Sequence, residues 1–304
     1  MKDTLETISK IPTIQSVKKI VLTKELEKRI PKMVIGLIKK GYKKVNAYSV
    51  QYKSNGHNVA GYIVESKKVT KNSPCIIWNR GGSKHFGVIT MKGVFVDMAR
   101  LAEQGYIVFA SQYSGGPGSE GEDDFGGEVT LNDVLNLKKI INKYPSADSK
   151  NVVMMGWSRG GMMTYRALAE VKWIKAAIVG AGPTDEVTAS AFREGWREHQ
   201  VMMYGGSKKE QIKRSAVYWT DKISKKTPIL IMHGTSDWRV SVKSSTRLSE
   251  KLIDEKVPHR LVIFEGGDHG LSEHRKDVDE MTAKWLERFI KNKEKLPDLK
   301  PHGR

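Results

Sequence analysis

A run of apolar residues that ends at a serine between two glycines constrains this sequence more than any other feature. Residues 152–155 read as a buried strand, and the pattern Gly156-x-Ser158-x-Gly160 follows directly. Residues 162–169 then continue in a helix-compatible run. A sharp turn between strand and helix lifts a serine hydroxyl out of the sheet edge, and glycines avoid clashes in it. The pattern predicts a nucleophile elbow; the alternative is a glycine-rich β-to-α turn with an exposed serine.

Strands and helices alternate from residue 74 onward. Strands are predicted at 75–78, 106–110, 152–155, 174–179, 228–232 and 260–264, and helices at 95–102, 131–141, 162–169 and 278–289. Alternation of this kind builds a parallel sheet covered by helices. The sequence therefore predicts an α/β fold with a mostly parallel central sheet and helices on both faces.

One catalytic domain with an N-terminal extension is expected, and the extension ends near residue 45. Residues 1–44 are predicted to form an N-terminal helical extension of two short helices, either a cap on the main domain or an arm that contacts another subunit. Residues 45–304 are expected to form the catalytic domain. It starts with a β-hairpin at 45–65, because the Asn55-Gly56 pair can take the positive φ angles of a tight turn.

A helical insertion, or lid, is predicted at about 183–226, where the sequence has no strand pattern. Its aromatic residues either line a substrate pocket or pack the insertion onto the domain. The candidate pocket residues are Trp157, Phe192, Trp196, Tyr204 and Trp219.

The charge of the chain suggests a basic surface and no nucleic-acid partner. The 304 residues carry 52 Lys and Arg against 34 Asp and Glu, a net charge of +18. The lysines are spread along the whole chain without interleaved aromatics, which favours a solvated surface over a polyanion site. The start of the chain lacks a signal-peptide core, and no apolar run reaches the ~20 residues of a membrane span. A cytoplasmic protein without membrane contact is expected, in which the one cysteine, Cys75, is buried.

A serine nucleophile needs a base, and the base needs an orienting carboxylate. His269 fits the base, because it lies in a glycine-rich loop after the last predicted strand and follows the serine in the order serine, acid, histidine. Asp237 fits the acid, because it follows the strand at 228–232. The competing residues, which fit less well, are Asp185 and Asp268 for the acid and His199, His233 and His259 for the base.

An oxyanion hole is expected from backbone N–H groups at two places. One is Arg159, directly after the serine, and the other is Arg80 or Gly81 in the loop after the first strand of the alternating region. The alternative for that loop is a tight turn without a catalytic role. This chemistry requires no metal and no organic cofactor.

Six blocks in this order resemble the catalytic domain of the prolyl oligopeptidase family of α/β-hydrolases, over about residues 45–290. The blocks are Asn79-Arg80-Gly81-Gly82, residues 121–127, Gly156-Trp157-Ser158-Arg159-Gly160-Gly161, residues 214–219, residues 233–237 and Gly267-Asp268-His269-Gly270. The resemblance implies an α/β-hydrolase fold with Ser158, Asp237 and His269 as the triad. Peptidases of the family often carry a tyrosine where this chain has Arg80. Residues 1–44 are too few for the β-propeller of the large members.

The expected function is a serine hydrolase that cleaves an ester or a short-peptide amide through an acyl-enzyme intermediate. One alternative is a carboxylesterase with no peptidase activity, since both reactions use the same chemistry. The other is a non-catalytic binding protein on a hydrolase fold.

Overall fold

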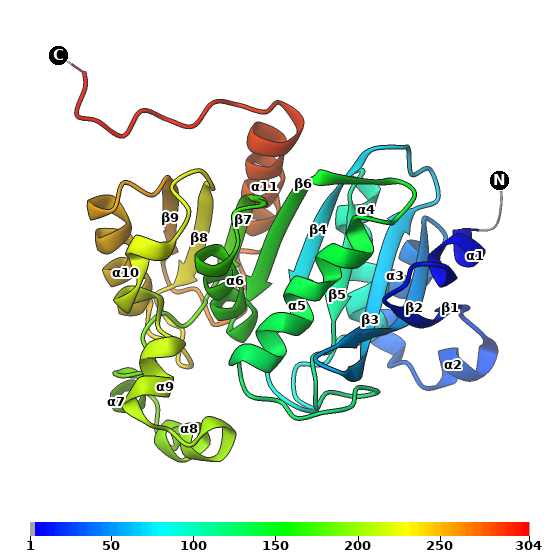
Figure 1. The fold of residues 1–304 in the computed structure, drawn as a ribbon, viewed down its shortest axis with the longest axis horizontal. Helices are drawn as coiled ribbons and strands as arrows, with labels where there is room; N and C mark the ends of the chain where they lie inside the picture. The colour runs from blue at the N-terminus through cyan, green and yellow to red at the C-terminus, as the bar shows by residue number, and fades with distance from the viewer. Residues whose placement is uncertain (1–3, 304) are drawn as a thin grey trace. The chain divides into compact units, whose positions relative to one another are not determined.

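The computed structural model describes residues 4–303, which cluster into two compact units. The first unit holds the residues up to Asp123 and residues 128–152, and the second holds residues 124–127 and the chain from Val153 onward. In both units, helices flank the strands (Figure 1). Strand β6 (Ala147–Trp157) begins in the first unit and ends in the second.

The strands of the first unit hydrogen-bond in the order β1-β2-β3-β5-β4. Neighbours from β1 to β5 pair antiparallel, and β5 pairs parallel with β4. The elements are α1 (Thr4–Ser9), β1 (Ile14–Lys19), α2 (Lys24–Lys28), α3 (Lys32–Tyr42), β2 (Val45–Ser54), β3 (His57–Ser66), β4 (Ser73–Asn79), the π-helix η1 (Gly93–Met98), α4 (Ala99–Glu103), β5 (Ile107–Ser111) and α5 (Glu128–Ile141).

Strands β2 and β3 form the predicted hairpin. Their register closes at Ser54 opposite His57, so the loop is the two residues Asn55 and Gly56. Both have positive φ, 50° and 80°, which this tight turn requires and which asparagine and glycine tolerate. The prediction for 45–65 is therefore confirmed.

The N-terminal segment contains a strand that the prediction of two short helices missed. Besides α1, α2 and α3, residues Ile14–Lys19 form β1, which pairs with β2 at the edge of the sheet. This strand is mostly exposed and carries lysines. Charged residues on an edge strand prevent pairing with other chains, and they also remove the apolar alternation by which a strand is recognised.

The second unit contains the end of β6 followed by β7, β8 and β9, and the last three pair in parallel. Helix α6 packs against β7, and α10 packs against β8 and β9. The elements are α6 (Arg159–Glu170), β7 (Ile174–Gly180), α7 (Ala189–Phe192), α8 (Trp196–Tyr204), α9 (Lys208–Lys213), the 3-10 helices η2 (Ala216–Tyr218) and η3 (Thr220–Lys222), β8 (Ile229–Gly234), α10 (Val242–Asp254), β9 (His259–Phe264), α11 (Arg275–Leu286) and the π-helix η4 (Glu287–Lys291).

The segment between β7 and β8 is helical, as the strand-free sequence predicted. Helices α7, α8 and α9 form a group that lies apart from the strands of the same unit (Figure 1). The predicted α/β fold, with a mostly parallel sheet flanked by helices, is confirmed. None of the helices in residues 4–303 is both long and apolar enough to cross a bilayer.

Helix α3 packs so closely on η1 that one of its glycines has no room for a side chain. A Cβ at Gly41 would lie 1.7 Å from the carbonyl oxygen of Phe95, whereas a Cβ at Gly36 of the same helix meets nothing within 4 Å. We expect Gly41→Ala to destabilise the protein by about 1–3 kcal/mol through overpacking. Gly36→Ala is the matched control and should stabilise it by about 0.5–1 kcal/mol, because alanine favours the helix. Urea unfolding measures both, and equal midpoints for the two variants would contradict this packing.

Candidate active site

Ser158 lies at a strained turn between β6 and α6. Its φ of 56° is rare for a residue with a side chain, and such strain is typical of a nucleophile elbow. Gly156 makes the turn possible, because a Cβ there would lie 2.2 Å from the carbonyl oxygen of Gly160. The Ser158 N–H donates to the Gly180 carbonyl at the end of β7 (2.8 Å). The local fold therefore holds the serine where the sequence placed it.

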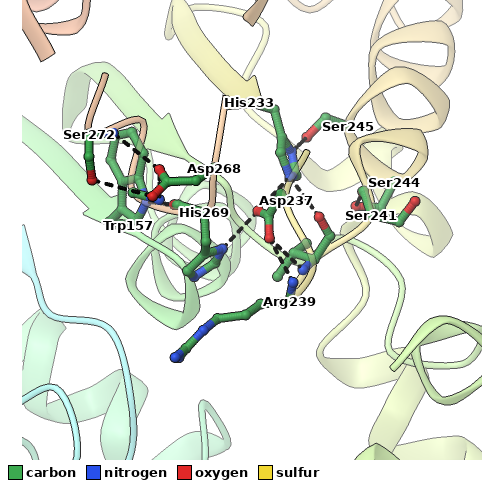
Figure 2. A network of polar contacts seen from close by, with 12 residues as sticks. Trp157, His233, Asp237, Arg239, Ser241, Ser244, Ser245, Asp268, His269 and Ser272 are labelled. Carbon is green, nitrogen blue, oxygen red and sulfur yellow. Dashed lines mark hydrogen bonds and ion pairs between the residues drawn. The ribbon is translucent and has the colours of Figure 1, made fainter. Parts of the chain in front are cut away.

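Asp237 and His269 form a hydrogen-bonded pair in the same unit. His269 Nδ1 lies 2.7 Å from Asp237 Oδ2, and the carboxylate is buried (Figure 2). The other carboxylate oxygen, Oδ1, accepts from the backbone N–H groups of Arg239 (2.8 Å) and Val240 (3.0 Å). Within residues 4–303, no hydrogen bond joins Ser158 Oγ to the His269 ring. Contacts of this kind are often long before substrate binds.

The loop that carries His269 is hydrogen-bonded to the elbow and to the loop that carries Asp237. The indole N–H of Trp157, next to the serine, donates to the His269 carbonyl (2.6 Å). The Ser236 N–H donates to the Gly267 carbonyl (2.9 Å). A Cβ at Gly234 would lie 2.1 Å from that same carbonyl oxygen, so the end of β8 and the histidine loop are in backbone contact. These contacts bring Asp237 and His269 to the serine's own turn.

The hydrogen bonds around Asp237 decide its protonation. Burial by itself raises the pKa of this carboxyl group, but hydrogen bonds from His233 and His269 outweigh burial and bring the pKa well below its ordinary value. Asp237 therefore remains ionised at neutral pH. An ionised carboxylate beside Nδ1 fixes the imidazole tautomer and stabilises an imidazolium.

His233 is a contact of the acid that the sequence did not single out as part of the site. Its Nε2 lies 3.1 Å from Asp237 Oδ2, the same oxygen that contacts His269. The sequence weighed His233 only as a base and ranked it below His269. The signal that points to its contact is the four-residue spacing to Asp237 across the end of a strand.

The other competing residues are engaged elsewhere. Asp185 forms an ion pair with Arg247 (2.5 Å), and Asp268 accepts from the backbone of Gly270 and Ser272 within its own loop. His259 contacts Ser249 Oγ (2.7 Å), and His199 stacks on Trp196 with ring centroids 4.4 Å apart. Of the carboxylates considered, Asp237 is the one in contact with His269.

The candidate oxyanion donors lie in different units. Arg159 is the first residue of α6, where backbone N–H groups point out of the helix end. Arg80 belongs to the first unit, and its buried side chain donates to the carbonyls of Gln112, Lys84 and Phe86, at 2.8–3.1 Å. The Arg80 guanidinium therefore holds together the loop that contains Gly81.

The candidate pocket residues separate into four groups. Trp196 and Tyr204 both donate to Glu186 Oε2, at 2.9 and 3.2 Å, and both contact the Phe125 ring. Trp157 holds the histidine loop. Phe192 is 47% exposed on α7, and Trp219 is buried and donates to the Ile212 carbonyl (3.0 Å). Trp219 therefore packs the insertion internally.

Two further residues of this insertion neighbourhood escaped the sequence prediction. Glu186 is fully buried, and its burial raises the pKa of its carboxyl group despite hydrogen bonds from Gln200, Trp196 and Tyr204. Phe125 comes from a distant loop that the sequence quoted only as part of a glycine-rich block. In residues 4–303, no group of three or more His, Cys, Asp or Glu side chains is arranged to hold a metal ion.

We predict that Trp157→Phe lowers kcat about tenfold, because the histidine loop loses the hydrogen bond that fixes its carbonyl. The accompanying loss of stability should be about 1 kcal/mol. The matched control is Trp285→Phe, since the buried Trp285 N–H has no hydrogen-bond partner among residues 4–303. Steady-state kinetics and thermal unfolding of both variants test this expectation. A kcat for Trp157→Phe equal to that of Trp285→Phe would contradict it.

The chain is similar in sequence to known peptidases. The model of the prolyl oligopeptidase family matches residues 93–293. The uncharacterized peptidase YtmA of Bacillus subtilis is 28% identical over 80% of this chain and 93% of its own length. Dipeptidyl-peptidase 5 of Porphyromonas gingivalis is 24% identical over 78% of this chain, but this covers only 37% of that longer protein.

Solved structures agree on the fold. The acylaminoacyl peptidase of Pyrococcus horikoshii superimposes with a TM-score of 0.74 at 23% identity, over 87% of this chain and 45% of that one. A putative dienelactone hydrolase from Klebsiella pneumoniae superimposes with a TM-score of 0.61 at 17% identity, over 80% of this chain and 98% of that one. This chain therefore spans less than half of the larger peptidase. With the family model covering most of its α/β-hydrolase fold, the chain belongs to the prolyl oligopeptidase family and is a serine hydrolase.

Proposed function

We propose that Ser158, Asp237 and His269 form the catalytic triad of a hydrolase that cleaves short peptides or small esters. The observation that carries this proposal is the 2.7 Å contact between His269 Nδ1 and the buried, ionised Asp237. The histidine loop is bonded to Trp157, the residue that precedes the strained serine. Nucleophile, acid and base then follow the chain order of this fold.

In the proposed reaction, Ser158 Oγ attacks the carbonyl carbon of the scissile bond while His269 Nε2 takes the serine proton. Asp237 remains ionised and stabilises the imidazolium that forms. The imidazolium then gives its proton to the leaving amine or alcohol, and an acyl-enzyme remains. Water attacks the acyl-enzyme with His269 as base, and this step releases the acid and restores the serine.

The negative oxygen of the tetrahedral intermediate needs N–H donors. We propose the Arg159 N–H, directly after the nucleophile, as one such donor. We also propose that the insertion contributes to the acyl pocket through Trp196 and Tyr204, which share the Glu186 carboxylate. Similarity to dipeptidyl and acylaminoacyl peptidases supports a short peptide as substrate.

Labelling with a fluorophosphonate probe tests the nucleophile. We expect the probe to modify Ser158, as identified by mass spectrometry of the labelled peptide. Ser158→Ala should lower kcat by about 10⁴-fold or more. Ser236→Ala, which removes an exposed serine of the acid loop, is the control and should retain full labelling and rate. Labelling at another serine would refute this assignment.

Matched substrates distinguish the two reactions that the triad supports. We expect turnover of dipeptidyl or aminoacyl anilides as well as of short acyl esters, because amide and ester cleavage share the acyl-enzyme. Comparison of kcat/KM across these series at fixed acyl size measures the preference. Turnover of esters alone would make the protein a carboxylesterase and would exclude the proposed peptide substrate.

A further inference from the structure

Two histidines share one oxygen of the acid. His269 Nδ1 and His233 Nε2 lie 2.7 and 3.1 Å from Asp237 Oδ2. Figure 2 shows Asp237 between the two rings. His269 carries a partly exposed side chain, whereas His233 is fully buried at the end of β8. The proposed triad uses one of these histidines, and the second takes no part in its proton transfers.

The partners of His233 define its tautomer. Nε2 faces two acceptors, the Asp237 carboxylate and the Val240 carbonyl (2.9 Å), so this nitrogen carries the proton. The opposite nitrogen, Nδ1, lies 2.7 Å from the hydroxyl of the buried Ser245 on α10. In the neutral ring this hydroxyl donates to Nδ1, so Ser245 holds the ring with its N–H toward Asp237.

With His233 included, every accepting position of the carboxylate is occupied. Oδ1 accepts from the N–H groups of Arg239 and Val240, and Oδ2 accepts from the two histidines. An ionised carboxylate offers about four lone-pair positions, two on each oxygen. The Asp237 side chain therefore cannot rotate without breaking a hydrogen bond, and one lone pair of Oδ2 is left for His269.

We propose that His233, held by Ser245, is a positioning residue that fixes the Asp237 carboxylate for His269. This inference rests on the proposed triad and adds to it a link that runs from α10 through His233 to the acid. His233 does not contact the reacting atoms in this scheme. It affects the rate by keeping one lone pair of Asp237 Oδ2 directed at His269 Nδ1. A small displacement of a catalytic group lowers the rate strongly.

Replacement of His233 tests the link. We expect His233→Leu to lower kcat about tenfold to a hundredfold, with KM nearly unchanged. His233→Gln keeps an N–H near the position of Nε2 and should recover a large part of the rate. Ser245→Ala should cause a smaller loss, of about threefold, because Nε2 still faces its two acceptors.

The matched control is His259→Leu. His259 has the same kinds of partner, a serine hydroxyl (Ser249, 2.7 Å) and a backbone carbonyl (Val257, 2.9 Å), but no carboxylate partner among residues 4–303. This variant should unfold more easily and keep the kcat of the wild type. Circular dichroism confirms that each variant is folded before its rate is compared.

A double-mutant cycle separates positioning from a general structural role. In an Asp237→Asn background, His233→Leu should change kcat by less than about twofold, because the carboxylate that it orients is gone. An equal loss in both backgrounds would overturn the proposal, as would a wild-type kcat for His233→Leu. If His233→Leu does not fold, a wild-type kcat for Ser245→Ala overturns it. High activity of Asp237→Asn itself would instead refute the triad, so the two failures are distinguishable.

Discussion

The site depends on the solvation of one buried carboxylate. A carboxylate removed from water loses a large hydration energy, and hydrogen-bond donors must replace it. Asp237 receives donors from the turn that follows it, from the buried end of β8 and from the loop after β9. The segments that surround the acid are thus ordered by the same bonds that keep it charged.

A second buried carboxyl group organises the insertion, although here burial outweighs the hydrogen bonds and raises the pKa. Glu186 accepts from Trp196, Gln200 and Tyr204, and the guanidinium of Arg214 lies 4.0 Å from the Tyr204 ring centroid. The Phe125 ring joins this cluster to the elbow, because the Arg159 guanidinium lies 4.9 Å from its centroid. The residue after the proposed nucleophile therefore connects the elbow to the wall of the proposed pocket.

The sequence predicted what local patterns encode. The turn at Asn55-Gly56 and most of the alternating strands and helices depend on neighbouring residues and were predicted close to their observed positions. Helix α10 was not predicted, and β6 begins five residues earlier than predicted. Edge strand β1 was missed, because it is stabilised by pairing with β2 and its lysine-rich sequence lacks the apolar alternation of a strand. Strand pairing is a tertiary interaction, so residue patterns alone describe it poorly.

The residues of the candidate site also divide into those that local patterns predict and those that depend on tertiary contacts. The Gly156-x-Ser158-x-Gly160 pattern singled out Ser158, and chain order and loop position singled out Asp237 and His269. His233, Glu186 and the Arg80 side chain each have a hydrogen-bond partner that is ten or more residues away in sequence. These partners are Ser245 for His233, Trp196 for Glu186 and Gln112 for Arg80. Buried polar groups must find such partners, but the sequence does not state which ones they find.

The short segment Asp124–Gly127 belongs to the second unit, although the residues on both sides of it belong to the first. Its carbonyls accept from Arg214 at Asp124 and Phe125 and from Arg166 at Gly126. The chain therefore passes between the units more than once. Cleavage at any single peptide bond leaves at least one unit without one of its segments. During synthesis, this segment is translated before both arginines. Its hydrogen bonds to Arg166 and Arg214 can therefore form only after the ribosome has synthesised the insertion up to Arg214.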